Sequence, residues 1–168
     1  MRHPMPLLLL AALGVLAASG CHRAADAATE AAIERASGQQ VDIDRDGGRM
    51  RITTGDGEAL ITAGAGVALP ADFPDDLFLP SSYGVTSVMD VGDARLVSLE
   101  SDGAVASMFE DARAAMAGKG WSQMLAMQQA DSAMLGFSQG GREATYTFTR
   151  HAGGPVLVGI QLRGDPRQ

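Results

Sequence analysis

An alternation of apolar and polar residues with a period of two begins at Val41, and it constrains the fold more than any other feature of the sequence. The same pattern returns at residues 49–53, and a third apolar segment follows at residues 59–62. Asp-Gly and Gly-Gly turn sequences separate the three segments. Such alternation is typical of β-strands that bury one face, joined by tight turns. The sequence therefore predicts a short β-meander over residues 41–69.

The second half of the chain carries strand patterns on both sides of one helical segment. Residues 104–117 predict a helix, because their large apolar residues recur at spacings that share one helical face. Asp102 is placed to cap the start of this helix, and Gly118 or Gly120 to end it. The strand-like segments are residues 85–91, 94–99, 121–127, 133–137, 142–149 and 156–162.

This order of elements predicts a fold of the α+β class. We expect an antiparallel sheet with one main helix packed across it over residues 83–163, preceded by the short β-meander. Three prolines lie between positions 70 and 80, so residues 70–82 predict an ordered, extended strap. Residues 21–40 predict a tether that contains an Ala-rich short helix over residues 24–37.

The N-terminal segment has the pattern of an export signal. A charge-free apolar run of twelve residues, Leu7 to Ala18, follows Arg2 and ends in Ser-Gly before Cys21. A helix that crosses a bilayer needs about 20 residues, so this run is too short to span one. It is typical of the apolar core of a signal peptide. We therefore expect residues 1–20 to be removed.

The segment LAASGC resembles the lipobox of bacterial lipoproteins. The resemblance implies lipidation at Cys21: a thioether-linked diacylglycerol, release from Gly20 and an acylated amine, together enough to anchor the chain in a membrane. His22 follows where an Asp would retain a lipoprotein at the inner membrane. In a Gram-negative cell this implies the outer membrane, facing the periplasm. The alternative is an ordinary secretory signal that leaves a free thiol at Cys21.

A second resemblance covers residues 38–163. FPDDLFLP, two strands, a helix and then Gly120-Trp121 opening a strand is similar to small bacterial envelope lipoproteins of uncharacterised function with an α+β domain. The resemblance implies that Trp121 anchors the core where the chain leaves the helix. It brings no catalytic residues to this sequence.

Charge and cysteine content exclude several classes of function. Removal of residues 1–20 takes away one Arg and no acid, so the net charge changes from −7 to −8. Such an acidic chain does not predict nucleic-acid binding, which needs clustered Lys and Arg. Cys21 is the only cysteine, so the chain forms no internal disulfide and offers no thiolate metal site.

Two acidic groups are candidate metal sites. Asp42-x-Asp44-x-Asp46-Gly47 opens like an EF-hand loop, but Thr53 stands where the loop needs its bidentate Glu. Strand alternation around these acids favours a solvated hairpin. A second group lies in the strap, Asp72, Asp75 and Asp76, for which a solvated loop is again favoured. The sequence therefore predicts no metal and no cofactor.

Methionine and histidine are the other residues that could bind a metal or catalyse a reaction. Five methionines lie close in sequence, at positions 108, 116, 124, 127 and 134, and thioethers can bind Cu(I). Core filling is the more usual role of such residues. His22 lies beside the anchor and His151 in a Gly-rich turn, and the sequence has no G-x-S-x-G, H-E-x-x-H or Ser-x-x-Lys motif. We therefore predict no catalytic residue.

These observations predict a membrane-anchored lipoprotein that is not an enzyme. We expect a periplasmic binding or assembly accessory domain with an envelope protein as its partner. The alternative is a small-ligand or lipid carrier of the envelope, with a pocket at the sheet or between sheet and helix.

Overall fold

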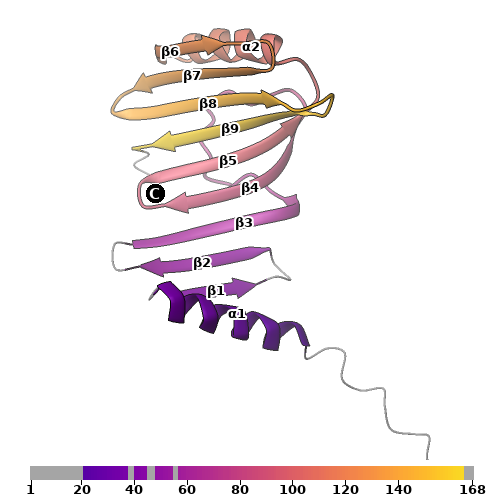
Figure 1. The fold of residues 1–168 in the computed structure, drawn as a ribbon. Helices are drawn as coiled ribbons and strands as arrows, with labels where there is room; N and C mark the ends of the chain where they lie inside the picture. The colour runs from indigo at the N-terminus through magenta and orange to yellow at the C-terminus, as the bar shows by residue number, and fades with distance from the viewer. Residues whose placement is uncertain (1–20, 38–39, 45–47, 55–56, 165–168) are drawn as a thin grey trace, which may run out of the picture.

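One antiparallel sheet of nine strands forms most of the molecule (Figure 1). The computed structural model describes residues 21–37, 40–44, 48–54 and 57–164. The strands are β1 (Gln40–Asp44), β2 (Arg49–Thr54), β3 (Gly57–Val67), β4 (Gly84–Val91), β5 (Ala94–Ser101), β6 (Ser122–Gln128), β7 (Ser132–Gln139), β8 (Arg142–Arg150) and β9 (Val156–Arg163). The helices are α1 (Cys21–Ser37) and α2 (Val105–Gly118). The strand order is β1-β2-β3-β4-β5-β9-β8-β7-β6, so only β5 and β9 are neighbours that lie far apart in sequence.

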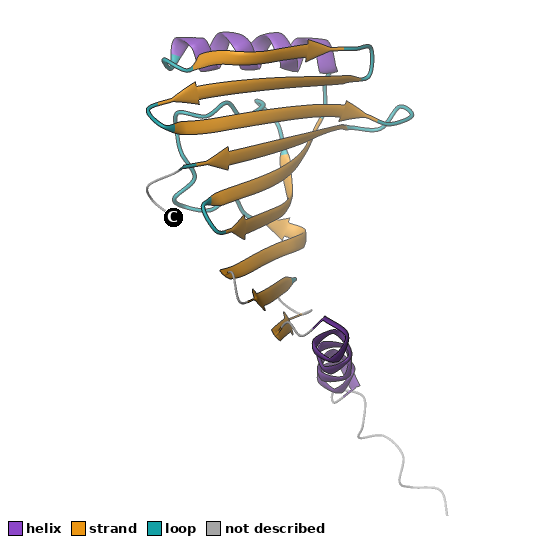
Figure 2. Ribbon diagram, turned by 60° about the vertical axis from the view of Figure 1, so that its left-hand side comes forward, coloured by secondary structure: helices purple, strands orange, loops and turns teal. Residues whose placement is uncertain are grey.

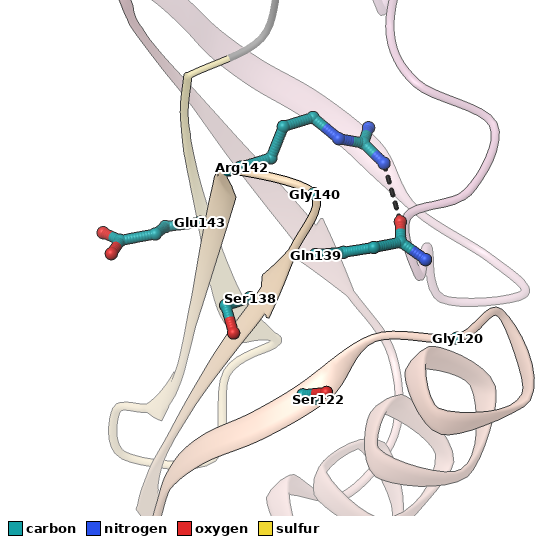
Figure 3. Close-up of a pocket in the computed structure, with 8 residues that line it drawn as sticks. Gly120, Ser122, Ser138, Gln139, Gly140, Arg142 and Glu143 are labelled. Carbon is teal, nitrogen blue, oxygen red and sulfur yellow. Dashed lines mark hydrogen bonds between the residues drawn. The ribbon is translucent and has the colours of Figure 1, made fainter.

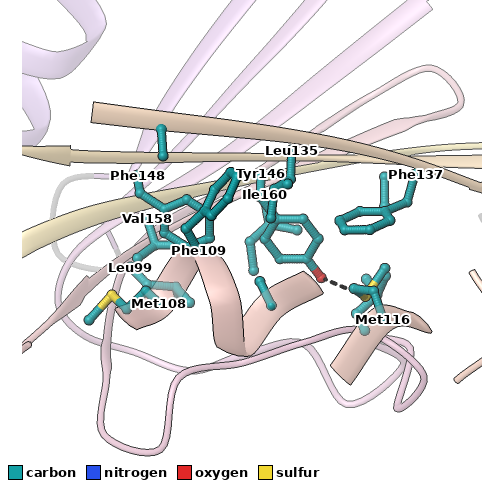
Figure 4. Close-up of a cluster of buried hydrophobic side chains, with 14 of the residues drawn as sticks. Leu99, Met108, Phe109, Met116, Leu135, Phe137, Tyr146, Phe148, Val158 and Ile160 are labelled. Atoms are coloured by element: carbon teal, nitrogen blue, oxygen red, sulfur yellow. Dashed lines mark hydrogen bonds between the residues drawn. The ribbon is translucent and has the colours of Figure 1, made fainter. Parts of the chain in front are cut away.

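Strands β5, β7, β8 and β9 bury one face beneath α2 and the strap (Figure 4). The alternation predicted for the last strand is confirmed, because Val156, Val158, Ile160 and Leu162 are all fully buried. Tyr146 and Phe148 of β8 lie on the same face with stacked rings 6.2 Å apart. From α2 the core receives the apolar stripe expected from the sequence, namely Val105, Met108, Phe109, Ala112 and Met116.

The ends of α2 differ in how well the sequence predicted them. Its N-cap is Ala104, which makes no side-chain capping bond, so the expectation that Asp102 caps the helix is wrong. At the other end Gly120 adopts a φ of +84°, and its N–H donates to Ala117 O (3.1 Å). Trp121 N donates to Met116 O (3.0 Å), which completes a Schellman ending. Trp121 is buried as expected.

The predicted strap, residues 70–82, packs over the same face of the sheet as α2. Tyr146 Oη accepts a hydrogen bond from Phe78 N (2.9 Å) and donates to Phe78 O (3.2 Å). Trp121 Nε1 donates to Asp76 O (3.1 Å). Burial of the Tyr146 hydroxyl raises its pKa far above the usual range, while the Phe78 hydrogen bond opposes the rise and nearby Asp76 adds to it. This single side chain therefore ties the strap to the sheet.

Charged pairs hold the strap at two further points. Arg95 is buried, and it donates to Asp90 Oδ1 (2.6 Å) and to Asp72 Oδ1 (3.0 Å). Desolvation disfavours its charge, but these two carboxylates outweigh desolvation and raise the Arg95 pKa. Arg142 forms the second pair with Asp76. Its guanidinium also lies 4.7 Å from the centre of the Trp121 ring.

The fold class predicted from the sequence is wrong. The molecule is mostly β, and α2 spans only 14 residues at one end of a nine-stranded sheet (Figure 2). The predicted meander does not precede a separate α+β unit. Strand β3 extends over 11 residues and pairs with β4, with Ile61 opposite Met89, so both halves share one hydrogen-bonded sheet. Local periodicity predicted the strands but carried no information on this pairing.

Candidate functional site

The face of the sheet opposite α2, called here the open face, carries an apolar row across five strands. Its members are consecutive cross-strand partners in β1 to β5, namely Ile43, Met50, Ile61, Met89 and Leu96. Directly opposed residues share a face, and successive residues alternate. Val97 belongs to the core beneath α2, so its neighbour Leu96 and the whole row lie on the open face.

Three large apolar side chains of β5, β7 and β9 are exposed on the open face. Leu96 is 38% exposed, Leu157 of β9 is 40% exposed and Met134 of β7 is 36% exposed. Small and polar residues lie between Met134 on one side and Leu96 on the other, because Thr147 is opposite Gly159 in the β8–β9 pair. A Cβ at Gly159 would lie 2.5 Å from Thr147 Oγ1, so a larger residue there would force the threonine side chain to move.

The two edges of the sheet differ. Along β1, helix α1 packs against the strand, and Glu30 Oε1 accepts a hydrogen bond from Ile43 N (2.7 Å). At the other edge all seven residues of β6 are exposed, with Met124 at 57% and Met127 at 56%. In the part of the chain that the structure describes, no element pairs with the outer side of β6.

The acidic strap residues are engaged by arginines. Asp72 pairs with Arg95, and Asp76 pairs with Arg142. Asp75 offers its backbone oxygen to Lys119 Nζ (2.9 Å). Sequence reasoning found the acids but missed the two arginines, which lie 23 and 66 residues further along the chain. The carboxylates of Asp72 and Asp76 therefore hold the strap to the sheet, and no group of metal-ligating residues occurs within the described ranges.

The EF-hand-like acids lie on a strand. Asp42 and Asp44 are exposed on β1, whereas Val41 is buried. The strand alternation favoured from the sequence is confirmed at these positions. Asp46 lies outside the described residues.

The expectation that all five methionines fill the core is wrong for three of them. Met108 and Met116 are buried, but Met124, Met127 and Met134 are exposed at 57%, 56% and 36%. The error has a structural cause, because β6 is an edge strand and the open face of β7 has no covering layer in the described part of the molecule. Neither property can be read from a local apolar pattern.

The remaining predicted positions lie in the N-terminal segment and in the turn between β8 and β9. The expected signal peptide, residues 1–20, lies outside the described residues. Cys21 is the first residue of α1, and its side chain and that of His22 are likewise not described. His151 is exposed in the turn between β8 and β9.

Two surface hollows differ in lining from the pocket predicted for a carrier. One, of about 350 Å³, is lined mainly by polar residues and glycines around the β7–β8 turn, including Gln139 and Arg142 (Figure 3). In it Arg142 Nη2 donates to Gln139 Oε1 (2.7 Å). Another, of about 320 Å³, lies between α2 and β6 and is lined by Arg113, Gln123 and neighbouring residues. Neither is the Phe- and Met-lined pocket expected of a lipid carrier.

Comparisons with known proteins complete the description of the chain. No family model, no curated protein and no solved structure matches it. Among the described residues, neither helix is long and apolar enough to cross a bilayer. The features that indicate a function are therefore the open face, the free edge and the N-terminal sequence.

Proposed function

We propose that this chain is a membrane-anchored envelope lipoprotein whose domain binds another envelope protein without catalysing a reaction. The observation that carries this proposal is the open face of the sheet, where Leu96, Leu157 and Met134 are exposed on one surface. Exposed apolar side chains grouped on one face mark protein-binding sites more often than isolated ones do. The lipobox-like LAASGC segment supports the anchor at Cys21.

The sheet geometry supports a protein partner more than a carried ligand. The space between α2 and the sheet is filled by fully buried side chains, among them Tyr146, Phe137 and Phe148. A carrier needs a cavity there or at the open face. The hollow on the open face, lined by Met127, Met134 and Thr147 among others, has a volume of about 190 Å³, below the roughly 300–1,000 Å³ of ligand pockets. The open face therefore suits a partner that brings its own complementary surface.

The anchor is tested by replacing its cysteine. In Cys21→Ser the thioether cannot form, so we expect the chain to move from the membrane fraction to the soluble periplasmic fraction. Exposed Ser107→Ala on α2 provides a control that should remain in the membrane fraction. Unchanged membrane association of Cys21→Ser would remove the anchor from the proposal.

The binding face is tested separately in intact cells. A photo-reactive phenylalanine analogue replaces Leu157 on the open face, and the same analogue replaces Ser107 on the outer face of α2 as a matched control. We expect one protein to be captured repeatedly from position 157 and not from position 107, as identified by mass spectrometry. Capture of a lipid or metabolite at position 157 would favour the carrier, and equal capture at both positions would contradict a specific face.

A further inference from the structure

Strand β6 is an edge that lacks the usual protection against pairing. Every residue from Ser122 to Gln128 is exposed, and none carries a charge. Natural edge strands are commonly protected by lysines, prolines, bulges or a covering element, because a free edge is a template for another strand. The opposite edge has such a cover in α1, while β6 has only a bulge at Met124. The two edges are therefore not equivalent, and β6 is the one available to a second strand.

We infer that β6 pairs antiparallel with β6 of a second copy of this chain, around a two-fold axis at Ala126. The pairing joins two nine-stranded sheets into one and places both open faces on the same side. Charge makes β6 the surface where two copies can meet. Two copies of this acidic chain repel each other over most of their surfaces, whereas this uncharged strand brings no like charges together. The inference does not depend on the proposed function.

The alternation of β6 selects the register. Leu125 and Met127 lie on the open face, opposite Gly136 and Met134 of β7, whereas Ala126 lies opposite core residue Leu135. A two-fold axis at Ala126 sets Leu125 of one copy opposite Met127 of the other, so residues of the same face meet. An axis at Leu125 would set Met127 opposite Gln123, which lies on the other face because the bulge at Met124 shifts the alternation.

Other face-consistent registers overlap less. An axis at Met127 would pair only residues 126–128 of the strand with one another, whereas the axis at Ala126 pairs residues 124–128. The Ala126 register therefore allows the most backbone hydrogen bonds. It also sets Leu125 of each copy opposite Met127 of the other copy. These are among the most exposed large apolar side chains of the molecule.

The size of this contact predicts a weak dimer. One strand of seven residues buries less than the roughly 1,200–2,000 Å² of a standard stable interface. We therefore expect reversible, concentration-dependent association. The proposed anchor at Cys21 would raise the local concentration at a membrane surface and so favour the same contact, but the pairing itself does not require the anchor.

Disulfide trapping of the full chain tests the register directly. Opposed residues in an antiparallel pair have Cα atoms about 4.5–5.5 Å apart, within the range of a disulfide. Ala126→Cys faces its own copy at the axis, so we expect a covalent dimer on mild oxidation. Leu125→Cys alone and Met127→Cys alone lie diagonally, about 7–8 Å from their own copies, and should not crosslink. A mixture of these two variants should crosslink to each other.

Matched controls distinguish crosslinks made by β6 pairing from crosslinks made by random collision or through Cys21. The parent chain, with Cys21 as its only cysteine, sets the background, and Asp42→Cys places a thiol on the covered edge at β1. Mass spectrometry must identify the 126–126 crosslinked peptide. Three results would overturn the inference: no dimer of Ala126→Cys above the parent, equal crosslinking of Asp42→Cys, or a different protein captured at position 126.

A second measurement avoids cysteine. Ala126→Lys places like charges opposite each other at the axis, so we expect sedimentation of the full chain in mild detergent to show less dimer than the parent. Because Ala126 is exposed, its circular dichroism spectrum and melting temperature should match those of the parent. Unchanged self-association, or no self-association of the parent at any concentration tested, would also overturn the inference.

Discussion

The two ends of the sheet turn their apolar side chains to opposite faces. In β5, β7, β8 and β9 these side chains face α2 and the strap and form the buried core. In β1 to β3 the apolar partners Ile43, Met50 and Ile61 lie on the open face, and the α2 side of β2 and β3 carries Arg51 and Glu58, paired at 3.1 Å. Among the described residues of β1 to β3, only Val41 is buried. One hydrogen-bonded sheet therefore contains one well-packed end and one end held mainly by strand pairing and by α1.

The largest effect is expected within the well-packed end. Leu135→Ala on the buried face of β7 should lower the free energy of unfolding by about 2–5 kcal/mol, because it leaves a cavity beneath α2. The adjacent Met134→Ala on the open face should change it by less than about 1 kcal/mol. Denaturant unfolding of both variants measures the difference. Similar losses would mean that the open face is covered in solution.

The link between the strap and the sheet gives the next effect. Tyr146→Phe removes the hydroxyl that accepts from Phe78 N and donates to Phe78 O, so two backbone groups lose their partner. We expect a loss of about 1–3 kcal/mol in denaturant unfolding. Tyr83→Phe is the matched control, because Tyr83 is exposed, and it should leave stability unchanged. Equal losses in the two variants would show that the strap does not depend on this hydroxyl.

The same tyrosine predicts how stability depends on alkaline pH. Burial raises the pKa of folded Tyr146 above the value of about 10 of an unfolded tyrosine, so the folded state holds the proton more tightly. Its stabilising contribution is complete below about pH 10 and is lost as pH rises through the folded pKa, with a slope of at most about 1.4 kcal/mol per pH unit. Unfolding between pH 9 and 11 should show a steeper fall for the parent than for Tyr146→Phe. Identical slopes would contradict a buried, protonated hydroxyl.

The smallest effect is expected at the other end. Val41→Ala removes the one buried side chain of β1 and should cost about 1 kcal/mol, confined to α1, β1 and β2. Amide hydrogen exchange should quicken in these elements and stay unchanged in β8 and β9. Faster exchange throughout the sheet would show that the two ends unfold together.

Part of this structure was predictable from local patterns. Period-two alternation predicted the strands, and the apolar stripe predicted α2 to within one residue at each end. Gly120 and Trp121 were correctly placed at the end of α2. These features depend on residues a few positions apart, so a single sequence is sufficient to find them.

The α+β class was predicted wrongly because strand pairing is not local. Whether β3 pairs with β4, and β5 with β9, depends on contacts between distant segments. The same limit hid the candidate surface. Met127 and Met134 resemble core residues until β6 is known to be an edge and the open face of β7 to lack a cover in the described part of the chain. The strap acids were likewise expected to lie in a solvated loop, because their pairing with Arg95 and Arg142 is not local in sequence.

The sequence by itself determined where the strands, α2 and the turns lie, and it predicts export and lipidation at Cys21. Tertiary structure alone decided which face each strand buries and which edge stays free. The physical reason is that alternation specifies two faces but does not say which of them meets a partner, since that depends on the register with the neighbouring strand. For this protein that choice separates Leu135 in the core from Met134 and Met127 on the surface, where both proposed contacts are made.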